Sequence, residues 1–534
     1  MKYKMSEIFL YQRNHSHNTK LNVWMAFPGI YSFGMASIGY LSIFRFIDEM
    51  EDIFVERVFT DSKNTSVMAK DVDVIGFSFS FELDFLSILK MMKQYHIPFL
   101  AKDRDESHPL IFGGGPVLTS NPEPFAPLFD FIMIGDAENH GKTVIQLIKE
   151  NKHLPKKDVL ELLSKIEGIY VPSLTNFDKE QNAVTSLNGE EFKVNKTTAD
   201  LSECVYTPIL SEKSYFSNTF IVEVARGCPK MCGFCIASYL NLPVRFCSYE
   251  KIIEIIELGL QHTDKIALLG AMIAAHPDFE KICDYIIKKI DSGKKIELTV
   301  SSLRADHVSE KALEMLVKSG QRTATIAIEA GSERLRKVIN KNLSEEQIFS
   351  MVKKSKENGL HGLKIYAMIG LPTETYDDLN ELIDLISRLK KEHKGFDFTL
   401  SFATFVPKAQ TPFQYCERES TKSLEKKYEY LKKEFHKLGV KIRCSSVKWD
   451  YYQALFSRGD RRLCDYLIEV FESGANIGCF KNTYKKFEKN GLLPNSDHYA
   501  IRGIPPEART PWDFIKILKN PEFLNEEYYR LLRQ

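Results

Sequence analysis

Between residues 216 and 410 the chain alternates short apolar runs with amphipathic segments in a regular order. The apolar runs predict buried strands, and the amphipathic segments predict helices that cover them. Residues typical of helix ends flank these segments, with N-caps at Ser248, Ser309, Ser344 and Thr375 and C-caps at Gly320 and Gly359. Six strand–helix units of this kind predict a partial, open (β/α)6 version of the TIM-type barrel.

A cysteine-rich loop, ARGCPKMCGFCIASY, directly follows the first predicted strand of this barrel. Cys228, Cys232 and Cys235 have the spacing C-x3-C-x2-C, and three thiolates in one loop can hold a soft metal centre. A cubane iron–sulfur cluster has four irons and usually takes four cysteines. Three cysteines leave one iron open for a ligand from outside the protein.

Two other interpretations of the cysteines are less favourable. Structural zinc prefers closed sites built from C-x2-C pairs, and the sequence has no second such pair. A disulfide framework is not expected because the chain is large and shows no secretory segment. The other cysteines are scattered singly and are predicted to be separate thiols: Cys204, Cys247, Cys283, Cys416, Cys444, Cys464 and Cys479.

The C-x3-C-x2-C loop, with Phe234 before its last cysteine, resembles the signature of radical S-adenosylmethionine enzymes. The resemblance implies a [4Fe-4S] cluster on Cys228, Cys232 and Cys235. Its open iron would bind the amino and carboxylate groups of S-adenosylmethionine, and one electron would cleave the sulfonium to give a 5'-deoxyadenosyl radical. The same resemblance implies a reducing partner such as flavodoxin or ferredoxin.

The strand ends of the barrel supply further cofactor ligands by the same resemblance. Gly270 stands where relatives meet the methionine amino group, although the acidic residue of many relatives is missing there. Ser302 and Glu329 are expected near the ribose, Arg334 near the carboxylate, and the backbone from Ile369 to Leu371 near the adenine. From the residues alone, only Glu329 stands out, because a carboxylate in an apolar strand needs a partner. Arg334, Arg336 and Lys337 begin a predicted helix, where such side chains are more often solvated charges.

Residues 20–150 predict a second α/β unit, a parallel sheet with helices on both faces. Glycines and small residues follow its predicted strands, in FPGIYSFGM, GFSFSFE, FGGGPVLTSNPEP and IGDAE. These motifs resemble the flavodoxin-like, cobalamin-binding type of domain that precedes many radical S-adenosylmethionine cores, in particular one group of uncharacterised fused proteins. The D-x-H-x-x-G motif that supplies a cobalt ligand is missing, so a domain without cofactor remains the alternative.

The remaining segments complete an α/β chain. The polar composition of residues 151–215 predicts a linker, and the pattern of residues 411–534 predicts a mostly helical α+β extension. In the extension, the arginines of RGDRR (458–462) favour a salt-bridged domain contact over an anion site. The 216–410 segment between them is the predicted radical S-adenosylmethionine core.

Composition limits the function classes. Lys and Arg total 72 and Asp and Glu total 71, so no overall field favours a nucleic acid or an anionic membrane. No apolar run is long enough for a spanning helix, which predicts a cytoplasmic protein. The expected activity is reductive cleavage of S-adenosylmethionine to modify an unknown substrate, with cobalamin-dependent methyl transfer as one form. The alternatives are rearrangement, oxidation or tRNA-type modification without cobalamin, or a non-catalytic iron–sulfur redox protein.

Overall fold

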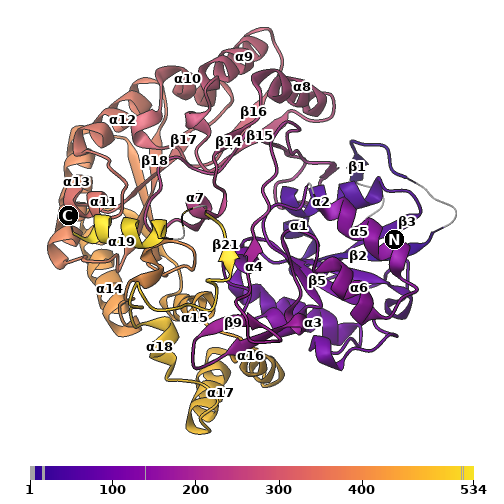
Figure 1. The fold of residues 1–534 in the computed structure, drawn as a ribbon. Coiled ribbons are helices and arrows are strands. Elements are labelled where there is room, and N and C mark those ends of the chain that lie inside the picture. Colours follow the sequence, from indigo (N-terminus) through magenta and orange to yellow (C-terminus); the bar gives the residue numbers. More distant parts are fainter. Residues whose placement is uncertain (1–6, 15–18, 139, 519, 521, 534) are drawn as a thin grey trace.

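The computed structural model describes the chain except residues 1–6, 15–18, 139, 519, 521 and 534. Two sheet-containing halves lie side by side, and the C-terminal segments run between them and around the second half (Figure 1). The first half is coloured indigo to magenta, and the second half rose to orange. The predicted α/β class and order of units are confirmed.

The first half contains a six-stranded sheet of order β3-β2-β4-β5-β6-β7. Its first five strands are parallel and follow the 2-1-3-4-5 order of flavodoxin-like domains, whereas the edge strand β7 is antiparallel. The bounds are β2 (Leu21–Phe27), β3 (Ile53–Phe59), β4 (Val74–Ser78), β5 (Leu110–Gly114), β6 (Phe131–Met133) and β7 (Ile169–Tyr170).

Helices cover both faces of this sheet. One core contains α2 (Ile38–Asp48) and α5 (Gly141–Asn151), and the other contains α3 (Phe85–Gln94) together with α16 (Leu463–Glu472) of the C-terminal extension. The apolar run IPFLA (97–101) forms no strand, in contrast to the other runs of this domain, and leads into a 3-10 turn at Ala101–Asp103.

The second half is an open barrel of parallel strands. Its strands form two sheets, β12-β15-β16 and β17-β18-β19-β20, which a parallel bridge between Leu303 and Ile326 connects. The bounds are β12 (Phe220–Glu223), β15 (Lys265–Leu269), β16 (Glu297–Val300), β17 (Thr323–Glu329), β18 (Gly362–Ile369), β19 (Asp397–Thr404) and β20 (Lys441–Cys444). Because β20 pairs with β19, the barrel continues beyond the expected end at residue 410.

Amphipathic helices enclose the barrel, as the sequence predicts (Figure 1). They are α8 (Tyr249–Leu260), α9 (Phe279–Asp291), α10 (Glu310–Lys318), α12 (Glu345–Glu357), α13 (Tyr376–Glu392) and α14 (Thr421–Lys437). The predicted N-caps are confirmed: Ser248, Ser309 and Ser344 accept backbone N–H groups of the first turn, and Thr375 forms a capping box. Gly320 and Gly359 follow helix ends with φ of 88° and 93°.

The segment expected to be a linker, 151–215, is integrated into the fold. It contributes β7 to the first sheet, a hairpin of β8 (Thr175–Asp178) and β9 (Ala183–Ser186), and two strands that pair with distant partners. These are β10 (Val194–Asn195) with β21 (Ile515–Lys516) and β11 (Ile209–Ser211) with β1 (Glu7–Phe9). Cys204 of this segment forms a disulfide with Cys247, so the prediction of separate thiols is wrong for this pair.

The RGDRR segment contacts the first half, which confirms the favoured interpretation of its arginines. Arg461 bonds the buried carboxylate of Glu123 at 2.9 Å and also reaches Tyr170 and Thr175. Arg458 is fully buried and donates to backbone carbonyls of the extension, while Arg462 pairs with Asp460. A buried charge needs this kind of pairing because its desolvation is costly.

We expect Arg461→Met to lower the free energy of unfolding by about 3–5 kcal/mol, because it leaves Glu123 as an uncompensated buried charge. Urea unfolding followed by circular dichroism measures this loss. The matched control is Lys157→Met, which removes an exposed ion pair with Glu161 worth about 0–1 kcal/mol. Equal unfolding midpoints for the two variants would contradict the structural role of Arg461.

Candidate cluster and cofactor site

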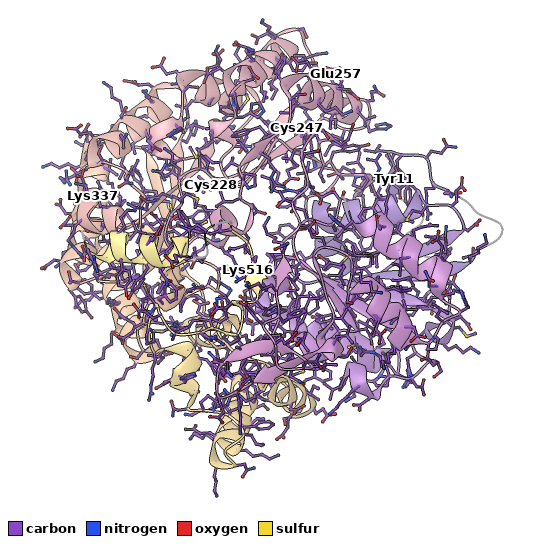
Figure 2. All side chains as sticks on the ribbon, in the orientation of Figure 1. Tyr11, Cys228, Cys247, Glu257, Lys337 and Lys516 are labelled. Carbon is purple, nitrogen blue, oxygen red and sulfur yellow. A yellow bond between two sulfur atoms is a disulfide. The ribbon has the colours of Figure 1, made fainter. Side chains whose placement is uncertain are left out.

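The cysteine loop lies at the carboxyl end of the first barrel strands. It connects β13 (Ala225–Arg226) to the short helix α7 (Ile236–Leu240) and places Cys228 in the interior of the second half, on the side toward the first half (Figure 2). Cys228 and Cys235 are half-buried, and Cys232 is only 7% exposed. The sequence predicts this position, because sites on such barrels form where strands end.

Asn340 braces the loop from the segment that follows α11 (Glu333–Val338). Its side-chain amide donates to the carbonyl oxygens of Lys230 at 3.1 Å and Met231 at 2.8 Å, which lie between the first two cysteines. Its own carbonyl oxygen is 3.8 Å from the Cys232 Sγ. Because both Met231 and Asn340 have positive φ, of 50° and 58°, the two turns fit together only in a restricted geometry.

An apolar layer supports the loop from behind. Phe234 packs on a small core that includes Leu371 from the end of β18 and Leu531 from the C-terminal helix α19 (Phe523–Leu532). Gly233 bonds Phe413 through its carbonyl oxygen at 3.0 Å, and a Cβ at Gly233 would lie 2.7 Å from the Phe413 ring. Glycine at this position therefore allows the close approach of the loop to this layer.

A group of charged side chains lies beside Cys232. Glu329, at the end of β17, pairs with Lys341 at 3.2 Å, and Arg304 pairs with Asp306 at 2.8 Å. Arg304 also donates to the Lys341 carbonyl oxygen, which joins the two pairs. Glu329 has a φ of 65°, and its neighbourhood in β17 contains a register shift, so the chain is bent where this carboxylate emerges.

These groups act on the thiol of Cys232. Burial raises its pKa to about 12, Lys341 and Arg304 lower it, and Cys235 and Glu329 raise it. A metal ligand must be a thiolate, so cations next to this cysteine favour the form that binds. The pKa of the Cys235 thiol is also raised by burial, while Ser238 lowers it through hydrogen bonds.

The donor set fits an iron–sulfur cubane better than a single ion. Within the described residues, no three His, Cys, Asp or Glu side chains are gathered closely enough to hold one metal ion. A cubane takes each thiolate on a different iron, so its ligands stand apart around a larger inorganic core. Three soft donors in one braced loop therefore suit the cluster.

Three other residues predicted to bind cofactor, Gly270, Ile369 and Leu371, lie at or just after the ends of barrel strands. Gly270 is buried at the end of β15, and its carbonyl oxygen accepts from Ser301 at 2.9 Å, so Ser301 rather than Ser302 bonds this strand end. Ile369 is buried and bonds Phe405 through its carbonyl oxygen at 2.9 Å. Leu371 lies in the same apolar core as Phe234, which brings the backbone that follows β18 next to the cysteine loop.

Arg334 bonds the start of α13 and the segment just before it. Its guanidinium is 49% exposed and pairs with Asp378 at 2.6 Å, and it also bonds Thr373 at 3.0 Å. The cations that act on Cys232 are instead Lys341 and Arg304.

Sequence reasoning missed several residues of the site. Arg336, expected to be a solvated charge, is fully buried and donates to the carbonyl oxygens of Leu343 and Ala330 at 2.6 and 3.0 Å. It thus supports, from inside, the turn that carries Asn340 and Lys341. The available signal is the pair of asparagines in INKN (339–342), since asparagine readily adopts positive φ.

Two segments of the chain match known protein families. Residues 39–172 match the N-terminal region of radical SAM proteins, and residues 222–386 match the radical SAM superfamily. The second match includes the three cysteines and all strand ends considered above.

Within the described ranges, no helix is both long enough and apolar enough to cross a membrane.

Two relatives and one solved structure are similar to parts of this chain. A protein of Methanocaldococcus jannaschii, itself uncharacterised, is 26% identical over 448 residues, covering 84% of this chain and 90% of that protein. The tRNA-2-methylthio-N(6)-dimethylallyladenosine synthase of Acetivibrio thermocellus is 27% identical over 212 residues, 37% of this chain and 42% of that protein. The chain thus spans less than half the length of this second relative. The radical S-adenosylmethionine methyltransferase TsrM from Kitasatospora setae, solved with cobalamin and a [4Fe-4S] cluster, has a TM-score of 0.47 and 12% identity, covering 71% of this chain and 74% of that chain.

We expect Asn340→Gly to weaken cluster retention about 10-fold, because residues that orient metal ligands typically contribute 10–100-fold to metal binding. Glycine keeps the positive φ of 58° and removes only the amide that holds the loop carbonyls. The rate of iron loss to a chelator measures the effect. Asn218→Gly is the control, since Asn218 has a φ of 53° just before β12, at the other end of the strand. Equal rates of iron loss in both variants would contradict the role of Asn340 in holding the cysteine loop.

Proposed function

The chain belongs to the radical S-adenosylmethionine superfamily, and we propose that Cys228, Cys232 and Cys235 hold its [4Fe-4S] cluster at the carboxyl ends of the barrel strands. The protein is accordingly a radical S-adenosylmethionine enzyme, with the cluster and S-adenosylmethionine as its cofactors. When bound, the cluster supplies the electron that cleaves the sulfonium of S-adenosylmethionine, while the protein supplies binding and orientation. The braced three-cysteine loop is the observation that carries this proposal.

The charged group beside Cys232 supports a role for the chain in orienting S-adenosylmethionine. Lys341 and Arg304 offer cations for its carboxylate, in place of the exposed Arg334. By this proposal, the Gly270 strand end lies near the methionine amino group, and the buried backbone from Ile369 to Leu371 lies near the adenine. By the same proposal, Ser302 and Glu329 lie near the ribose. Glu329 is held there by its ion pair with Lys341.

We further propose that the first half acts without cobalamin. The polar side chains at its strand ends are bonded to the rest of the chain: Glu82 to Lys408 and Gln453, Asn121 to Gly459, and Glu123 to Arg461. Two of its strand-end glycines, Gly115 and Gly135, are also accounted for by close packing of the chain on itself. A Cβ at Gly115 would lie 2.6 Å from the Phe79 carbonyl oxygen, and one at Gly135 would collide with Thr197. These groups are therefore poor candidates for cofactor contacts.

A second candidate is cobalamin-dependent methyl transfer. Ile30 and Phe33 after β2, and Phe81 after β4, are exposed apolar side chains at the carboxyl edge of the first sheet, where ligands of such sheets bind. An apolar edge of this kind is the observation that favours a bound ring system there. The retention of corrinoid separates this candidate from the first.

The decisive experiment uses anaerobically reconstituted protein with S-adenosylmethionine and dithionite, with and without hydroxocobalamin. We expect 5'-deoxyadenosine and methionine from the wild type, loss of both in Cys232→Ala, and no retained corrinoid after gel filtration. Cys283→Ala, at a buried thiol in α9, is the control and should keep the cluster. Retained corrinoid would favour methyl transfer. A cluster that survives in Cys232→Ala, or one that never responds spectroscopically to S-adenosylmethionine, would overturn the proposal in favour of a redox protein.

A further inference from the structure

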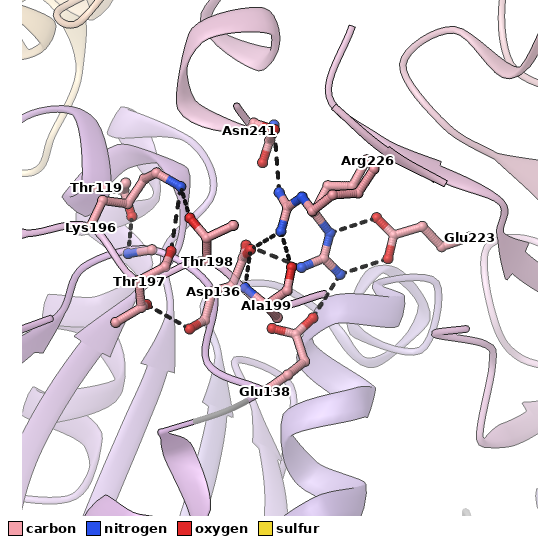
Figure 3. A network of polar contacts seen from close by, with 12 residues as sticks. Thr119, Asp136, Glu138, Lys196, Thr197, Thr198, Ala199, Glu223, Arg226 and Asn241 are labelled. Atoms are coloured by element: carbon pink, nitrogen blue, oxygen red, sulfur yellow. Dashed lines mark hydrogen bonds and ion pairs between the residues drawn. The ribbon is translucent and has the colours of Figure 1, made fainter. Parts of the chain in front are cut away.

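Arg226 is the last residue of β13 and stands two residues before Cys228. Its side chain points across the boundary between the two halves, toward the end of β6 in the first half (Figure 3). There it bonds Asp136 at 3.1 Å and Glu138 at 2.7 Å, both from the IGDAE strand end. On its own side it bonds Glu223 at 2.7 Å. One guanidinium thus connects three carboxylates from two domains.

Asp136 is held by a second arginine as well. Arg245, from β14 (Arg245–Phe246), bonds the other oxygen of Asp136 at 2.6 Å, and β14 pairs with β13 so that Arg245 lies opposite Arg226. The backbone N–H of Ala199 donates to Asp136 at 3.0 Å. Burial tends to raise the pKa of Asp136, but Arg226 and Arg245 outweigh it and lower the pKa, so the carboxylate stays charged.

The connection from Arg226 to the first cysteine has little freedom. Gly227, the one residue between them, has a φ of 91°. A Cβ at Gly227 would lie 2.7 Å from the Asn241 carbonyl oxygen, so this backbone is packed directly on the segment after α7. Because only the packed Gly227 separates the two residues, the backbone has little freedom to absorb a shift of Arg226 before Cys228.

We propose that Arg226 is a positioning residue for the cysteine loop, and that Asp136 and Glu138 of the first half hold it in place. Docking of the N-terminal domain thereby sets the position of Cys228 and, through it, the orientation of the open iron toward S-adenosylmethionine. The inference rests on the proposed function for the cluster and goes beyond it, because it assigns the IGDAE strand end to the alignment of the loop.

Two readouts test this inference, and the first needs no cluster. In full-length apoprotein, the alkylation rate of each cysteine by iodoacetamide is measured by peptide mass spectrometry. We expect Asp136→Asn to raise the rate at Cys228 about 10-fold, with Cys444 on β20 unchanged as the internal reference. Asp130→Asn is the matched control, because it breaks a buried pair with Arg104 in the same domain at a distance from the loop.

The second readout is the electron paramagnetic resonance spectrum of the reduced cluster with S-adenosylmethionine, which does not require turnover. We expect Asp136→Asn to keep the wild-type iron content, to change this spectrum, and to lower the rate of 5'-deoxyadenosine formation about 10-fold through misalignment. Combining Asp136→Asn with Arg226→Lys should have less than the product of the two single effects, because the two residues share one ion pair. If Asp136→Asn fails to fold, Glu138→Gln removes a contact at a carboxylate that is 31% exposed.

Each outcome separates this inference from the proposed function. A wild type that assembles no cluster overturns the proposed function, whereas the alkylation rates still decide the role of Arg226. If Asp136→Asn and Asp130→Asn give the same alkylation rate at Cys228 and the same spectrum, the inference is overturned and the proposed function still stands. Effects of Asp136→Asn and Arg226→Lys that multiply fully would also overturn it, because the two residues would then act independently.

Discussion

The pairing of strand-end carboxylates in the first half with cations of the barrel and of the C-terminal extension organises this molecule. Glu82 meets Lys408, Glu123 meets Arg461, and Asp136 meets Arg226 and Arg245. Each carboxylate follows a different strand of one parallel sheet, so the whole carboxyl edge is fixed against its neighbour at several points. Buried ion pairs add little net stability compared with apolar packing, but a broken pair is costly. Their main consequence is therefore a defined relative orientation of the two halves.

That orientation matters because the cysteine loop is itself held on several sides. Arg226 ties its beginning to the first half, Asn340 ties the carbonyl oxygens between the first two cysteines, and Leu531 supports the apolar side behind Phe234. The three supports come from regions far apart in sequence. The loop can therefore take its shape only when the N-terminal domain, the barrel and the C-terminal helix have all assembled.

Local patterns predicted the elements that depend on local physics. The period of apolar residues placed the barrel strands and helices, serine and threonine N-caps placed helix starts, and the cysteine spacing located the loop. The errors come from long-range pairing. Segment 151–215 looked like a linker because its strands are short and pair with distant segments. Arg336 looked solvated because nothing nearby in sequence reveals that it bonds the carbonyl oxygens of a turn.

The glycine-rich strand ends show why a motif can be identified correctly and still have more than one physical cause. Glycine permits any close approach to the backbone, whether the approaching group is a ligand or another part of the chain. At Gly115 and Gly135 the neighbours are the carbonyl groups of Phe79 and Thr197. Thr197 in turn accepts, at its carbonyl oxygen, the backbone N–H of Asp136 at 3.2 Å. The glycines therefore let the integrated segment lie against the strand end that aims Asp136 at Arg226, which joins this motif to the cysteine loop by contacts within the chain.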